Sequence, residues 1–212
     1  MKNVLIIDYN VGNIKSVQRA LEHIGANVTI SSNPKEIERA SKVILPGVGA
    51  FNSAMKEIDK LKLRKSILKF VATKQPILGI CLGMQMLLDS SEEFCEEDPQ
   101  PGLSIISGYS TKIPIKKIDQ NQLKLPHIGW SKLHIENQRT KLFKDITDKD
   151  SFYFVHSYMS IPSDSNCLTA NSKYGDNRIT AAIQQDNVYG VQFHPEKSGQ
   201  SGLKLLSAFL QL

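Results

Sequence analysis

A strand pattern passes directly into a helix pattern in the stretch Pro76-Ile77-Leu78-Gly79-Ile80-Cys81-Leu82-Gly83-Met84-Gln85. The apolar run 77–80 is typical of a strand covered on both faces, and residues 82–88 begin an apolar helix. The glycines at positions 79 and 83 allow the chain to turn sharply around Cys81. We therefore expect a strand–turn–helix unit with a cysteine at its corner.

Similar units lie on both sides of this stretch. Strand patterns occupy residues 4–7, 28–30 and 43–45, whereas helix patterns occupy residues 14–24, 34–40 and 51–73, the last in two pieces. Strands that alternate with helices are typical of a mostly parallel sheet flanked by helices, an α/β fold. In such sheets the functional site lies at the carboxyl ends of the strands. The turns after Ile7, Leu45 and Ile80 are expected to meet there.

The pattern changes between residues 90 and 150. Short β-like runs at 104–106, 110–118 and 132–135 predict a small antiparallel extension beside the main sheet. A core strand is then expected at 152–155, followed by a hairpin of 179–183 with 188–193 that turns at 186–187, and a helix whose apolar face contains residues 203, 206, 209 and 210. With no linker in the pattern, we predict one domain over residues 1–212.

Composition excludes several classes of protein. The chain has 212 residues, a net charge of +5 and 41% hydrophobic residues, and no apolar run approaches the roughly 18 residues of a membrane-spanning helix. Only five apolar residues precede Asp8, too few for the apolar core of a secretion signal. The three cysteines Cys81, Cys95 and Cys167 form no C-x-x-C pair, so we expect no metal, no cofactor and a reduced cytoplasmic setting. Basic residues without interleaved aromatics argue against nucleic acid.

Cys81 is a candidate nucleophile. Its position corresponds to the serine of a G-x-S-x-G turn, with a thiol in place of the hydroxyl. The N-terminus of the following helix favours a thiolate there, and the N–H of Leu82 is placed to stabilise an oxyanion. A small apolar cysteine packed at a strand end is the alternative for this residue taken alone.

His194 and Glu196 are the candidate partners of this thiol. They follow an apolar strand pattern in the sequence Val191-Gln192-Phe193-His194-Pro195-Glu196. In an extended chain, side chains two residues apart lie on the same side, so Glu196 could orient the imidazole of His194. His194 could then take the thiol proton and later donate it to a leaving amine.

A third candidate element is the loop Leu45-Pro46-Gly47-Val48-Gly49-Ala50-Phe51, which follows a buried strand. Its backbone N–H groups can approach a substrate, although an ordinary strand-to-helix turn would have the same sequence pattern. Pro46 has no N–H, so Gly47, Val48 and Gly49 remain as donors, and Val48 is the natural second oxyanion donor beside Leu82.

Together these elements resemble the class I, triad-type glutamine amidotransferases. Further segments resemble, more narrowly, the family of glutaminase subunits of imidazole glycerol phosphate synthases: Asp8-Tyr9-Asn10-Val11-Gly12-Asn13, Pro126-His127-Ile128-Gly129-Trp130, Tyr153-Phe154-Val155-His156-Ser157-Tyr158 and Gly190–Ser198. The similarity runs nearly end to end, and the segment 95–124 departs from the family pattern.

The resemblance implies a flavodoxin-like fold that hydrolyses glutamine to glutamate and ammonia. Cys81 would attack the amide, His194 would act as base and acid, and Glu196 would orient it. Gly49, Gln85 and the backbone at Ser157 and Tyr158 would hold the glutamine. The partner would be a (β/α)₈-barrel cyclase in a heterodimer, which uses the ammonia to make imidazole glycerol phosphate and aminoimidazole carboxamide ribonucleotide in histidine biosynthesis. A rotating peptide in the Pro46–Gly49 loop would keep the isolated chain a poor glutaminase until partner and acceptor are bound.

Two alternatives stay open at this point. The same glutaminase chemistry could supply ammonia to a sugar-amidating partner in surface polysaccharide synthesis, because the acceptor site lies on the other chain. A flavodoxin-like binding module or a cysteine-dependent stress protein would share the sheet and the cysteine. It would not need His194 and Glu196 paired beside Cys81.

Overall fold

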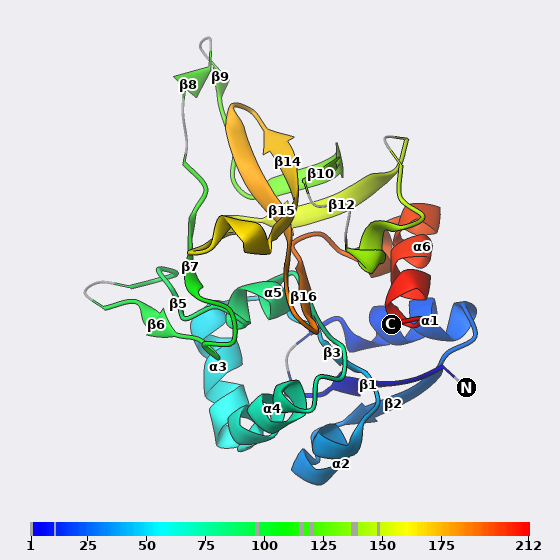
Figure 1. Cartoon of the computed structure of the whole chain (residues 1–212). Coiled ribbons are helices and arrows are strands. Elements are labelled where there is room, and N and C mark those ends of the chain that lie inside the picture. The colour runs from blue at the N-terminus through cyan, green and yellow to red at the C-terminus, as the bar shows by residue number, and fades with distance from the viewer. Residues whose placement is uncertain are drawn as a thin grey trace.

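An eight-stranded sheet forms the centre of the molecule in the computed structural model, which describes residues 2–10, 12–95, 98–114, 117–118, 121–136, 140–147 and 149–212 (Figure 1). The spatial order is β11-β14-β15-β16-β4-β3-β1-β2. The strands, in chain order, are β1 Asn3–Ile7, β2 Asn27–Ser31, β3 Val43–Leu45, β4 Ile77–Ile80, β11 His134–Ile135, β14 Leu168–Tyr174, β15 Asn177–Gln185 and β16 Val188–Val191. The pairs from β2 to β16 are parallel, and those from β16 to β11 are antiparallel. The expected α/β architecture is confirmed.

Helices cover both faces of this sheet, and the sheet separates two apolar cores. One face carries α1 Ile14–His23 and α6 Gly199–Phe209, and the other carries α2 Pro34–Arg39, α3 Phe51–Lys60 and α4 Leu63–Ala72 (Figure 1). The short helix α5, Leu82–Met86, follows β4 directly. The expected break in the 51–73 helix is present at Leu61 and Lys62, where Lys62 has a left-handed backbone conformation. The fully buried strands β3 and β4 contribute side chains to both cores.

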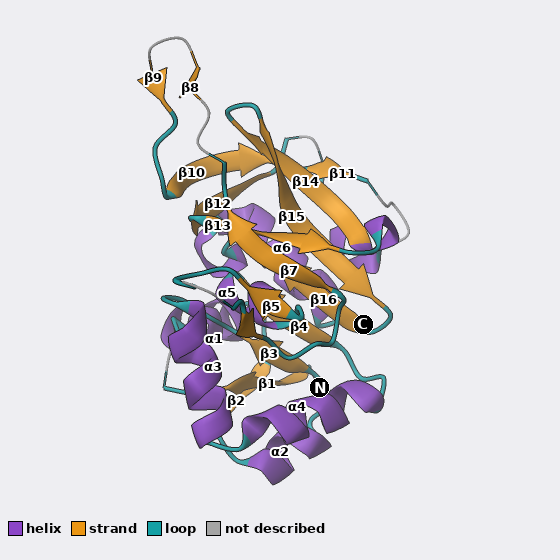
Figure 2. Ribbon diagram, turned by 90° about the vertical axis from the view of Figure 1, so that its left-hand side faces the viewer, coloured by secondary structure: helices purple, strands orange, loops and turns teal. Residues whose placement is uncertain are grey.

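The extension consists of three smaller sheets beside the central one (Figure 2). One has the order β13-β7-β5-β6 and the others pair β10 with β12 and β8 with β9. Their strands are β5 Ser90–Ser91, β6 Gln100–Pro101, β7 Gly108–Lys112, β8 Lys117–Ile118, β9 Asn121–Gln122, β10 His127–Lys132, β12 Ser151–His156 and β13 Tyr158–Pro162. Short 3₁₀ helices lie at η1 Lys141–Phe143, η2 Ser165–Cys167 and η3 Pro195–Lys197. All pairs are antiparallel except β5 with β7, which is parallel.

Several expectations in this region are wrong in detail. Residues 104–106 form no strand, because the backbone N–H groups of residues 103–106 bond to carbonyls at the end of α5 and just beyond it, and Ser104 has a φ of 52°. The expected run 110–118 is interrupted by Pro114, which has no N–H, and positions 115 and 116 lie outside the described residues. The run 132–135 is divided between β10 and β11. The core strand expected at 152–155, in contrast, is confirmed as β12, which pairs with β10 and buries Phe152 and Phe154 completely.

The hairpin near the C-terminus is confirmed. Strands β15 and β16 pair antiparallel through Gln185 and Val188, and Asp186 in the turn has a φ of 50°. Strand β16 ends at Val191, earlier than the expected residue 193. In the part of the chain that the structure describes, no helix has both the length and the apolar character needed to cross a membrane.

Candidate active site

Cys81 occupies a strained corner between β4 and α5. Its backbone angles, φ 54° and ψ −109°, lie outside the regions that residues other than glycine ordinarily adopt. Cys81 is the N-cap residue of α5. Close packing explains the glycine that follows it by two positions: a Cβ on Gly83 would lie 1.9 Å from the carbonyl oxygen of Leu45. The expected strand–turn–helix unit is therefore confirmed, and its corner presents the Cys81 side chain.

His194 and Glu196 form a buried pair. The Nδ1 atom of the imidazole lies 2.8 Å from the Oε1 atom of Glu196, and the Nδ2 atom of Asn13 approaches the same oxygen at 3.5 Å. The sequence predicted this pairing from an extended chain, and that reason is wrong. His194 instead caps η3, which Pro195 begins, so the two side chains meet across a 3₁₀ turn. The Nδ1–H group donates to the carboxylate and leaves Nε2 free of any hydrogen bond among the described residues.

The surroundings of His194 favour its charged form. Burial alone lowers the pKa of the imidazole, but the neighbouring Cys81 and Glu196 side chains outweigh burial and raise the pKa of His194 above its ordinary value. An imidazolium at this position is therefore stabilised whenever its neighbours carry negative charge. This is the environment that a proton carrier between a thiol and a leaving amine requires.

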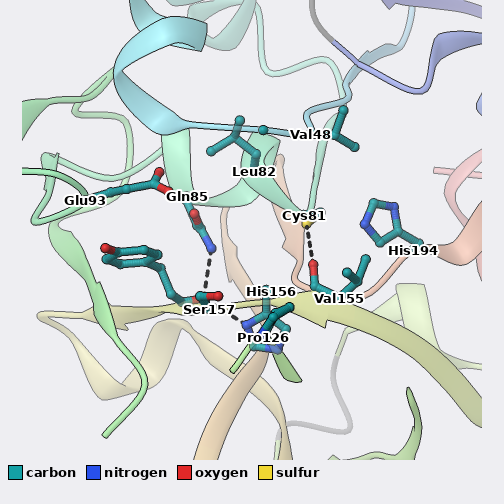
Figure 3. A pocket seen from close by; sticks show the side chains of 12 residues that line it. Val48, Cys81, Leu82, Gln85, Glu93, Pro126, Val155, His156, Ser157 and His194 are labelled. Carbon is teal, nitrogen blue, oxygen red and sulfur yellow. Dashed lines mark hydrogen bonds between the residues drawn. The ribbon is translucent and has the colours of Figure 1, made fainter. Parts of the chain in front are cut away.

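A cavity of about 260 Å³ joins these groups, a volume that suits a small metabolite. Figure 3 shows His194 beside Cys81 on one side of it, with Gln85 and Glu93 on the other. The thiol of Cys81 lies 3.9 Å from the carbonyl oxygen of Val155, a hydrogen bond that holds the sulfur at the cavity wall. The candidate residues that the sequence predicted all line this cavity except Glu196, which lies behind the imidazole: Val48, Gly49, Cys81, Leu82, Gln85, Ser157, Tyr158 and His194.

Both N–H hydrogens of the Gln85 side-chain amide are hydrogen-bonded within the protein. Its Nε2 atom donates to the carbonyl oxygen of Tyr158 at 3.0 Å and to the Oε1 atom of Gln192 at 2.9 Å. Gln192, fully buried, in turn directs its own Nε2 toward the Cys81 sulfur at 3.6 Å. Because an amide has only two donor hydrogens, Gln85 can offer a ligand only its Oε1 atom, an acceptor.

Glu93 is a cavity residue that the sequence reasoning missed. Its Oε2 atom accepts the N–H of Phe51 at the start of α3, at 2.7 Å, and burial raises the pKa of this half-buried carboxyl despite that hydrogen bond. No spacing rule connects Glu93 to Cys81, because it lies beyond β5 in a turn. Its acidic character beside the β5 segment is the one signal in the sequence.

Two buried histidines support the far wall. The Nδ1 atom of His156 lies 2.8 Å from the Tyr158 carbonyl oxygen, so it must carry the proton. Its Nε2 atom is then the acceptor for the Nδ1–H of His127 at 3.1 Å, and the Nε2 of His127 accepts from Ser131 at 3.3 Å. Burial lowers the pKa of His127 to about 4 and that of His156 to about 3, so both rings are neutral at physiological pH.

Comparison with known proteins identifies the family. The model of the class-I glutamine amidotransferases matches residues 5–211. The chain belongs to this family. Curated relatives include imidazole glycerol phosphate synthase subunit HisH of Methanosarcina acetivorans, 46% identical over 213 residues, and subunit HisH 1 of Legionella pneumophila (strain Lens), 42% identical over 216 residues; both alignments cover 100% of each chain.

Solved structures of other amidotransferases share the fold. PurLQS from Thermotoga maritima superposes with a TM-score of 0.74 at 19% identity, covering 99% of this chain and 97% of that one. The glutaminase domain of Trypanosoma brucei CTPS with bound acivicin gives a TM-score of 0.67 at 14% identity, covering 99% and 94%. At these identities the likeness concerns the fold of the amidotransferase family alone.

Proposed function

We propose that this chain is the glutaminase subunit of an imidazole glycerol phosphate synthase, which hydrolyses glutamine and passes the ammonia to a cyclase subunit in histidine biosynthesis. The observation that carries the proposal is the placement of Cys81 and His194 on one small cavity, with Glu196 hydrogen-bonded to the imidazole behind it. The full-length similarity to subunits of that name supports the choice of reaction within the family.

The proposed mechanism begins with proton transfer. The free Nε2 atom of His194 takes the thiol proton, and the Cys81 sulfur attacks the side-chain amide carbon of glutamine. The resulting imidazolium, supported by Glu196, donates its proton to the amide nitrogen, so the C–N bond breaks and ammonia leaves. Water, deprotonated by the same imidazole, then attacks the glutamyl thioester and releases glutamate and the thiol. No cofactor enters any of these steps.

The tetrahedral intermediate needs donors for its oxyanion. Leu82 is the first residue of α5, so its N–H has no acceptor within the helix and is available to the cavity. Val48 lines the same cavity near Leu82 (Figure 3) and is the proposed second donor. We infer that rotation of the Gly47–Val48 peptide turns this donor toward or away from the intermediate, so partner and acceptor binding would raise the rate.

The opposite end of the cavity suits the α-amino acid group of glutamine. Gln85 Oε1 and the Glu93 carboxylate are both acceptors and would bind the α-ammonium group. The Tyr158 carbonyl already accepts from Gln85 and His156, so the backbone at Ser157 and Tyr158 would meet the α-carboxylate with N–H groups. With Gly49 beside Cys81, this orientation puts the side-chain amide at the sulfur.

The proposed docking surface for the cyclase is the outer face of β10. Ile128 and Trp130 are each 58% exposed there, and Trp130 makes an edge contact with Tyr153 on β12. Pro126, which immediately precedes this strand, lines the cavity. A (β/α)₈-barrel cyclase bound to this face would cover the cavity mouth and receive the ammonia without release to water. We place the heterodimer in the cytoplasm, the setting that its three free cysteines favour.

The sugar-amidating alternative uses the same glutaminase site, so the acceptor enzyme decides between the two. The test is co-purification of the chain with the imidazole glycerol phosphate cyclase and with a sugar amidotransferase, followed by an assay of glutamine-dependent product. Stable association with the cyclase and glutamine-dependent imidazole glycerol phosphate formation are expected. Association with the sugar enzyme alone would contradict the proposal. The binding-module alternative is disfavoured by the family match over residues 5–211.

A further inference from the structure

Tyr9 connects the end of β1 to the loop that follows β3. The residue is fully buried, and its phenol oxygen donates a hydrogen bond to the carbonyl oxygen of Pro46 at 2.6 Å. Burial, and after it the neighbouring Cys81, raises the pKa of this phenol, so it remains a donor at neutral pH. None of the steps in the proposed mechanism uses this side chain.

The bond fixes one peptide of the Pro46–Gly49 loop. Pro46 O belongs to the same planar unit as the N–H of Gly47, so Tyr9 sets the orientation of both. The space around Gly47 is equally restricted: an added Cβ would lie 2.8 Å from the Gly83 nitrogen, 2.8 Å from the Leu82 Cβ and 2.9 Å from the Tyr9 oxygen. The Pro46–Gly47 peptide is therefore held between Tyr9 and the start of α5.

The loop has open space at Gly49. Gly49 has a φ of 91°, and an added Cβ there would meet no atom within 4 Å. Because Gly47 is crowded and Gly49 is not, the peptides between these two glycines have the most room to rotate. Turning the Gly47–Val48 peptide changes ψ of Gly47 and φ of Val48, and the open space at Gly49 accommodates the compensating change.

We propose that Tyr9 is a positioning residue that anchors the Pro46–Gly47 peptide, so that rotation of the loop is confined to the two peptides that flank Val48. The proposal rests on the proposed glutaminase function for its consequence, since an anchored loop limits the Val48 N–H to the orientations that rotation of its own peptide reaches, one of which faces the oxyanion. Without the anchor, the whole loop samples more orientations and the donor is aligned for a smaller fraction of the time.

The first experiment measures the mobility of the loop directly and does not depend on enzyme activity. It compares amide ¹⁵N relaxation at Gly47 and Gly49 in the wild type, Tyr9→Phe and Tyr189→Phe. Tyr189 is also buried, and the described residues give its hydroxyl no hydrogen bond, so it is the matched control. We expect a Gly47 order parameter of about 0.85 in the wild type and in Tyr189→Phe, and a fall toward about 0.6 in Tyr9→Phe. An unchanged Gly47 value in Tyr9→Phe, at wild-type melting temperature, would overturn the proposal.

The second experiment measures the kinetics of glutamate release by the complex with the cyclase and bound acceptor. Loss of one hydrogen bond predicts a kcat for glutamate release that is roughly three- to tenfold lower in Tyr9→Phe, with the KM for glutamine within about twofold of the wild type. Inhibition by glutamate γ-semialdehyde, whose adduct with Cys81 places an oxygen at the oxyanion site, should weaken by the same factor. Alkylation of Cys81 by iodoacetamide should keep its wild-type rate.

A rise in KM with unchanged kcat, or equal kcat in Tyr9→Phe and Tyr189→Phe, would overturn the positioning role. The two proposals fail separately. If the wild-type complex released no glutamate, the proposed function would fail, whereas the relaxation measurement would still decide whether Tyr9 anchors the loop.

Discussion

The Nδ1 atom of His194 lies 2.8 Å from the Oε1 atom of Glu196, and the side chains of both residues are almost completely buried, with 2% and 1% of their surface exposed. The Nε2 atom on the other side of the ring has no hydrogen-bond partner among the described residues. The carboxylate therefore fixes which nitrogen carries the proton, and the opposite nitrogen is free to receive the proton of Cys81.

This relationship predicts unequal losses from two substitutions. Glu196→Gln keeps the shape of the pair but removes the charge that supports the imidazolium, whereas His194→Ala removes the proton carrier itself. Glutamine-dependent kcat should fall at least about tenfold further in His194→Ala than in Glu196→Gln. Steady-state glutamate release by the complex measures both. Equal losses, at equal melting temperatures, would show that Glu196 has a more direct part in the reaction.

Glu93 predicts a binding defect rather than a chemical one. Glu93→Gln keeps an acceptor for the Phe51 N–H but loses the negative charge that would face the α-ammonium group of glutamine in the proposed orientation. The loss of a charge-assisted hydrogen bond should raise KM by roughly 10–100-fold, with kcat changed much less. The exposed neighbour Glu92 supplies the control variant Glu92→Gln. A fall in kcat at constant KM would rule out a role in binding the substrate amine.

The hydrogen bonds made by His127 and His156 predict an uncommon proton arrangement. Both imidazoles should carry their proton on Nδ1, because the chain of acceptors ends at the Tyr158 carbonyl oxygen. With pKa values lowered to about 4 and about 3, neither ring should titrate between pH 5 and pH 8. The ¹⁵N shifts of the ring nitrogens report both properties directly. An Nε2–H form of either ring, or a titration step near pH 6.5, would contradict this network.

Asp150 predicts a pH-dependent contribution to stability. Burial opposes its charge, but hydrogen bonds from Ser201, Lys204 and Thr147 hold the pKa of this carboxyl well below its ordinary value. The folded state thus binds fewer protons than the unfolded state at acidic pH, so the contribution is present above about pH 4 and decreases as the pH falls below it.

Asp150→Asn should lower the free energy of unfolding by about 1.5–3 kcal/mol at pH 7, because bonds to a charged group are lost. The deficit relative to the wild type should shrink progressively below pH 4. Urea titrations at pH 7 and pH 3 measure the effect, with Asp145→Asn as the control because that carboxyl is 57% exposed. A deficit of the same size at both pH values would contradict the assignment.

Local patterns predicted the fold where the periodicity was strong and the partners were close. The apolar run 77–80 predicted β4 because a short, continuous apolar run is typical of a strand buried on both faces. The glycines around Cys81 predicted the turn from this strand into α5. The same reasoning gave a wrong prediction for residues 104–106, which form no strand. The apolar residues Ile105 and Ile106 pack in the core beside the end of α5, and the N–H groups of residues 104–106 bond to the carbonyls of Leu87 and Leu88, just beyond α5, rather than to a strand.

In the candidate site, too, the residues in local motifs were predicted and those joined by long-range contacts were missed. Cys81, His194 and Glu196 were predicted because each lies in a motif whose residue types and spacing carry chemistry. Glu93 and Gln192 were not assigned roles, because their contacts with Phe51 and Gln85 join segments 42 and 107 residues apart. Only the folded sheet brings such segments together, so a single sequence holds no spacing that reveals them.

The most direct measurement follows the amide nitrogen of glutamine. The cyclase complex is supplied with acceptor substrate, glutamine labelled with ¹⁵N at the side-chain amide and an excess of unlabelled ammonium at neutral pH, where most bulk ammonia is protonated. The wild type should release one glutamate per turnover and place ¹⁵N in the imidazole glycerol phosphate formed. Cys81→Ala should lose glutamate release by a factor on the order of 10⁴–10⁶ and make only unlabelled product. Labelled product from Cys81→Ala, or unlabelled product from the wild type, would contradict the account.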